Sequence, residues 1–152
     1  MESLHPLFVH FPIALLLSAV GLDVAAVMLK RPGLHRVSLW NLGLGTVGAG
    51  VAVWTGWEAA EIAKHTFEIH QVMELHRKLG LTTLILGTSV LIWRLWRRDQ
   101  LTRRTRLVLL AILLVATGTL SYGAHLGGRL VYEFGVGGQF GDPAHEALPH
   151  QH

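Results

Sequence analysis

The chain has 152 residues, of which 51% are hydrophobic and only 15% are charged. Soluble domains carry about 25% charged residues, so this composition excludes an ordinary soluble globular domain. The sequence has no cysteine, which excludes disulfides, thiolate metal sites, iron–sulfur clusters and covalently attached haem.

Four long apolar blocks follow one another along the chain. They predict membrane-spanning helices at about 7–29, 37–57, 68–97 and 106–126. An apolar block of about 20 residues crosses roughly 30 Å as a helix. We expect helix three to begin near Thr66 as a polar stalk and helix four to end at Gly127 and Gly128. The fold class is therefore an all-α, four-helix transmembrane bundle, up-down-up-down, over residues 1–138, with a flexible tail at 139–152.

The positions of the cations predict the orientation of the bundle. Nine cations lie in two clusters that follow the first and third apolar blocks, whereas the other short polar segments hold two. Short loops rich in Lys and Arg stay in the cytoplasm, so we expect both termini in the periplasm of a bacterial inner membrane. This placement also argues against a nucleic-acid partner, despite the formal net charge of +3. The two clusters consist of Lys30, Arg31 and Arg36, and of Arg94, Arg97, Arg98, Arg103, Arg104 and Arg106.

Histidines are the main candidates for a functional site. Counted from the cytoplasmic helix ends, His10, His76 and His125 lie roughly 26–30 Å from that side and share one layer near the outer boundary. His70 lies one or two turns higher on helix three, and His5 is higher still. Ionisable side chains at membrane depth are costly and tend to face the bundle interior. Converging imidazoles therefore indicate a cofactor or metal site, although each histidine alone is more typical of a polar boundary residue.

Haem b is the preferred occupant of this site. Two neutral imidazoles are sufficient axial ligands for haem, and small residues such as Gly80 and Gly118 leave room for a porphyrin. His10 and His76 lie on diagonal helices and can clamp one iron, while His125 can pair instead. With His70 there are enough ligands for a second haem. The alternative is a zinc, copper or non-haem iron site with His10, His76 and His125 as ligands.

Two further residues lie on the cytoplasmic side. Asp23 is inside helix one, where a structural hydrogen bond, for example to Asn41, is the more common role than a proton relay. His35 stands alone on that side, without a second histidine near it in the sequence.

Both ends of the chain resemble a bacterial membrane family known as domain of unknown function 2231. The matching residues are His5, Pro6 and 9–14 near the N-terminus, and 126–128, 130–132 and 135–137 near the C-terminus. The resemblance implies a four-helix membrane domain, sometimes found beside redox domains such as Rieske proteins, and supplies no activity. Family members often carry a histidine where this chain has Phe134, which weakens a ligand assignment in that motif.

These observations predict a cytochrome b-like electron carrier rather than an enzyme with its own substrate. We expect a haem near the periplasmic face to exchange electrons with quinone or a periplasmic redox protein. The alternative function is a structural or assembly subunit in which the histidines bind nothing. The glycine-rich second helix can pack within the bundle or against another copy of the chain, so the sequence is also compatible with a homo-oligomer.

Overall fold

Four long helices make up the protein. The computed structural model describes residues 5–62, 66–97 and 101–136. The helices are α1 (His5–Met28), α2 (Gly33–Ile62), α3 (Phe67–Arg97) and α4 (Arg103–Tyr132). The described residues contain no strand, so the predicted all-α class is confirmed.

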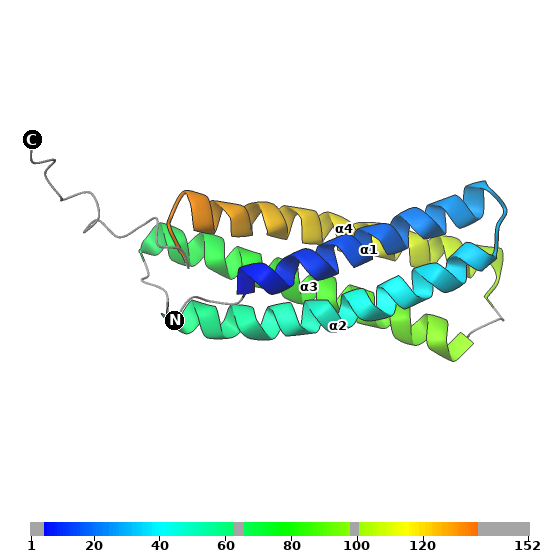
Figure 1. Ribbon diagram of the computed structural model, residues 1–152, viewed down its shortest axis with the longest axis horizontal. Helices are drawn as coiled ribbons and strands as arrows, with labels where there is room; N and C mark the ends of the chain where they lie inside the picture. The colour runs from blue at the N-terminus through cyan, green and yellow to red at the C-terminus, as the bar shows by residue number, and fades with distance from the viewer. Residues whose placement is uncertain (1–4, 63–65, 98–100, 137–152) are drawn as a thin grey trace, which may run out of the picture.

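The helices form an up-down-up-down bundle (Figure 1). Helix α1 packs against α2 and α4, and α3 packs against the same two helices, so α1 and α3 are diagonal. The ends of α1 and α3 and the starts of α2 and α4 lie together at one end, which we call the basic end. The first turns of α1 and α3 and the last turns of α2 and α4 lie at the opposite end.

The outer surface of the bundle is apolar. Large hydrophobic side chains such as Phe11, Trp40, Ile85 and Val115 are exposed on all four helices. In the most apolar segment of each helix, no more than 33% of the residues are buried inside the protein. All four helices are long and apolar enough to cross a membrane. Hydrocarbon therefore takes the place of water around most of this surface.

Two helices extend beyond their predicted ends. Helix α4 does not stop at Gly127 and Gly128 but continues to Tyr132, and α2 continues to Ile62. Within a membrane, glycine allows helices to approach closely, and Gly127 packs against the His76 ring of α3. The beginning of α3 at Phe67 agrees with the stalk expected near Thr66. The predicted tail at 139–152 lies outside the described residues.

The two connections at the basic end have defined helix caps. Lys30 has φ 53°, a left-handed conformation that ends α1, and the Arg31 N–H donates to the Ala26 carbonyl at 3.1 Å. Thr102 precedes α4, where its side chain accepts a hydrogen bond from the Thr105 N–H at 3.2 Å. These caps bring the start of α4 and the end of α1 to the same end of the bundle.

Helices α1 and α2 approach each other most closely at Gly45. A Cβ at this position would lie 3.0 Å from Cγ of Leu16 and 3.2 Å from Cβ of Leu15. Neither atom is the flexible tip of a side chain, so neither can move without shifting α1. Gly50, on the same helix, has no atom within 4 Å of such a Cβ.

We therefore expect Gly45→Ala and Gly50→Ala to have opposite effects. Overpacking should make Gly45→Ala destabilising by about 1–3 kcal/mol. Gly50→Ala should be neutral or stabilising by up to about 1 kcal/mol, because alanine favours the helix. Thermal unfolding of both variants in the same detergent measures the difference. Equal unfolding temperatures would contradict the close approach of α1 and α2 at Gly45.

Candidate functional site

His76 faces the interior of the bundle from α3. It lies on the same side of the helix as the buried residues Ile69, Met73 and Thr83, and its side chain is half-buried. Its Nδ1 is 2.8 Å from the Gly123 carbonyl oxygen of α4. Because a carbonyl only accepts, Nδ1 carries the hydrogen, and in a neutral ring with this tautomer the lone pair is on Nε2. This tautomer is the one in which Nε2 can ligate a metal.

A glycine of α4 makes room for the His76 ring. A Cβ at Gly127 would lie 3.1 Å from Cε1 of His76, whereas a Cβ at the neighbouring Gly128 would have no atom within 4 Å. The glycine at position 127 thus lets the ring lie against the backbone of α4. Sequence analysis assigned these glycines to the end of the helix and missed this contact.

His10, His70 and His125 are exposed. At about 100° per residue, His10 and His125 lie on the sides of α1 and α4 opposite the buried residues of those helices. The His125 ring stacks on Tyr122 with a centroid distance of 6.4 Å. Within the described residues, no three metal-ligating side chains gather at one point.

The contacts between helices set the height of each histidine. Gly48 of α2 faces Pro12 of α1, and Thr46, two residues earlier on α2, faces Gly87 of α3. Because α2 and α3 run in opposite directions, the level of Pro12 corresponds to the position two residues before Gly87 on α3. His10 is two residues outward from Pro12, whereas His76 is about nine residues outward from that position on α3. His10 is therefore roughly 10 Å deeper than His76.

These relative heights correct the prediction, made by counting residues, that His10, His76 and His125 lie in one layer. The count took Lys30 and Trp93 as equal in height, but the helix ends at the basic end are staggered. His125 remains level with His76, because Gly123 and Gly127 on either side of it contact the His76 ring. On α1, the residue nearest in height to His76 is His5. It is the first residue of the helix.

A buried ion pair lies nearer the basic end. The Arg94 guanidinium of α3 donates through Nη2 to Oδ2 of Asp23 on α1. Asp23 is 1% exposed and Arg94 is 8% exposed. In α3, Arg94 lies on the same face as the buried residues Gly87 and Val90, so its position in the helix distinguishes it from the exposed cations of its cluster.

Two residues of α2 complete this network. The His35 Nδ1–H donates to Oδ1 of Asp23 at 2.8 Å. Arg94 Nη1 donates to the Ser38 hydroxyl at 3.2 Å, which donates in turn to the Ala19 carbonyl at 2.9 Å. The expected Asp23–Asn41 bond is wrong, because Asn41 donates to Ser18 instead. His35, for which the sequence predicted no partner, is bound to the Asp23 carboxylate. The network joins α1, α2 and α3.

The comparison with known families now identifies the chain. Residues 1–139 match the model of a family described as a predicted membrane protein, DUF2231. The chain belongs to this family. No curated protein and no solved structure matches the chain significantly. As a DUF2231 member, the protein is a membrane protein of a family whose description gives no activity. Phe134, where a family histidine was expected, packs in an apolar cluster with Ile69, Met73 and Leu130.

The Asp23–Arg94 pair should be strongly coupled in stability. Asp23→Ala and Arg94→Ala each leave one buried charge without its partner, at an expected cost of about 3–5 kcal/mol. The double variant removes both charges and should recover a large part of that loss. Thermal unfolding in detergent gives the three values.

A control for this cycle is Glu133→Ala. Glu133 forms an exposed pair with Arg129 at 2.8 Å, so its removal should change stability by less than about 1 kcal/mol. Simple addition of the two single losses in the Asp23/Arg94 double variant would rule out the buried pair.

Proposed function

We propose that this DUF2231 protein is a b-type haem protein of the bacterial inner membrane that transfers electrons. His76 supplies one axial ligand. The observation that carries the proposal is the hydrogen bond from Nδ1 of His76 to the Gly123 carbonyl, because it selects the tautomer that ligates through Nε2. Bound haem supplies one-electron redox chemistry.

The second ligand comes from α1, which is diagonal to α3. Two ligands on diagonal helices approach a group on the bundle axis from opposite sides, as the clamp expected from the sequence requires. The register favours His5 over His10 for this role, since His5 is closer to the height of His76 along the bundle. A haem bound through His10 or His125 would instead lie at the lipid-facing surface.

The donor set fits haem better than a non-haem metal. Zinc, copper and non-haem iron sites need three or more protein ligands. A haem needs only two imidazoles, because the porphyrin supplies the other four nitrogens. The proposed electron partners are a quinone or a periplasmic redox protein, since the His76 level lies at the end opposite the basic end.

The visible spectrum of the protein purified in detergent tests the haem. We expect sharp reduced-minus-oxidised bands with a stoichiometric haem content, and we expect His76→Ala to abolish them. Stoichiometric zinc, copper or non-haem iron without these bands would replace haem with the metal alternative. His5→Ala, His10→Ala, His70→Ala and His125→Ala then assign the second ligand, with loss of the bands expected for His5→Ala.

A pair of neighbouring glycines provides a finer test of His76. Gly127→Ala should displace the His76 ring and shift or weaken the bands, because its Cβ would lie 3.1 Å from the ring. Gly128→Ala is the matched control and should leave the spectrum unchanged, since its Cβ would meet nothing within 4 Å. If both variants gave the wild-type spectrum, the ligand would lie elsewhere.

The orientation of the bundle is open to a separate test, because the sequence contains no cysteine. Gly33→Cys marks the basic end, and Tyr132→Cys marks the opposite end, where the tyrosine is 90% exposed. With a membrane-impermeant maleimide on intact spheroplasts, we expect labelling of Tyr132→Cys alone, and of both variants after permeabilisation. The reverse pattern would place the basic end outside.

A further inference from the structure

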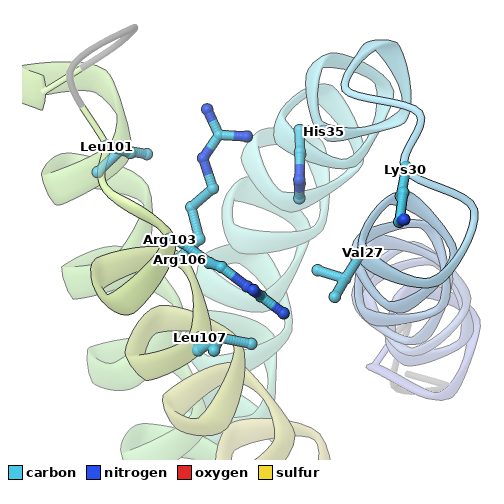
Figure 2. Close-up of a pocket in the computed structure, with 7 residues that line it drawn as sticks. All are labelled: Val27, Lys30, His35, Leu101, Arg103, Arg106 and Leu107. Carbon is cyan, nitrogen blue, oxygen red and sulfur yellow. The ribbon is translucent and has the colours of Figure 1, made fainter.

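A cavity of about 370 Å³ lies at the basic end, between α4 and the turn that joins α1 to α2. Four basic side chains line it, from three different segments: Lys30 from the turn, His35 from α2, and Arg103 and Arg106 from α4. Figure 2 shows these side chains around a common space, with the two arginines reaching from α4 towards the α1–α2 hairpin. Among the residues that the structure describes, no acidic side chain lines the cavity.

The positive charge of the cavity is not neutralised within the described part of the chain. There, the acidic partners belong to other basic groups, and none of Lys30, Arg103 and Arg106 forms an ion pair. His35 is held in the wall by its bond to Asp23, so its ring keeps a fixed position. Like charges this close repel one another, and an anion between them relieves that repulsion.

The remaining wall of the cavity is apolar. It consists of Val27 of α1, Leu101 and Leu107, where Leu107 begins the long apolar stretch of α4. Arg103 and Arg106 therefore come just before the part of α4 that lies in hydrocarbon. This arrangement, with cations next to an apolar surface at the end of the membrane span, matches a phospholipid, whose phosphate lies next to its acyl chains.

We propose that this cavity binds the phosphate group of an anionic phospholipid, such as phosphatidylglycerol, in the leaflet at the basic end. The acyl chains extend along the apolar surface that begins at Val27 and Leu107. The first turn of α4 adds its favourable dipole for an anion. Charge selects the occupant: a zwitterionic lipid brings its own cation into a cavity that is already lined by Lys30, Arg103 and Arg106. This site is independent of the haem.

Binding of short-chain lipids to the purified protein tests the proposal. Dioctanoyl phosphatidylglycerol should raise the unfolding temperature saturably, and dioctanoyl phosphatidylcholine should require at least about tenfold higher concentration for the same shift. Equal effects of the two lipids in the wild-type protein would overturn the proposal without any variant. Inorganic phosphate separates the lipid from a soluble anion: stabilisation by phosphate at the same concentration as phosphatidylglycerol would overturn the lipid assignment.

Two double variants with the same net charge locate the site. Arg103→Gln with Arg106→Gln removes two cations from the cavity and should weaken phosphatidylglycerol binding about tenfold or more. Arg36→Gln with Arg104→Gln removes two exposed cations at the same end that do not line the cavity, and it should retain binding within about twofold. Equal losses in both variants would show a diffuse surface charge effect and overturn the site.

Discussion

The buried pair of Asp23 and Arg94 constrains the rest of the bundle. In a membrane, a charged side chain without a partner costs several kcal/mol, so these residues must meet wherever the helices lie. Their contact crosses the bundle from α1 to α3, two helices that are diagonal to each other. Ser38 and His35 add hydrogen bonds from α2, so three helices share one fixed point. The relative height of the helices follows from this point and from the glycine contacts above it.

Small residues carry that register along the bundle. Gly45 and Gly48 let α1 lie directly against α2, and Gly123 and Gly127 do the same for α3 on α4. Between hydrocarbon-facing helices, close packing and interhelical hydrogen bonds replace the hydrophobic effect as the main attractive terms. The threonines contribute in the same way, since the hydroxyls of Thr83 and Thr119 are 2.9 Å apart across the α3–α4 contact. The same approach of backbones that holds the bundle together places His76 against a carbonyl of α4.

The sequence predicts the helices far better than the site. Hydropathy depends only on composition along the chain, so four spans and their order follow directly from blocks such as 7–29. Heights across the bundle depend on how helices are staggered, and nothing local to His10 or His76 encodes that. The role of Arg94 could have been read from its helical phase, because Gly87, Val90 and Arg94 repeat at helical spacing. Arg94 was instead grouped with the cations that follow it in the sequence, so its helical spacing was not considered. The contact of His35 with Asp23 could not be predicted locally, because Asp23 lies on the previous helix.

The two ends of the bundle differ in chemistry, and His35 connects the buried charges with one of them. Its ring lines the basic cavity while its Nδ1–H is bound to the Asp23 carboxylate, which also accepts from Arg94. The His35 side chain therefore lies between the cavity and the Asp23–Arg94 ion pair. His76 lies about five turns away from Arg94 on α3, so the proposed lipid site and the proposed haem ligand are far apart in the bundle and can be tested separately.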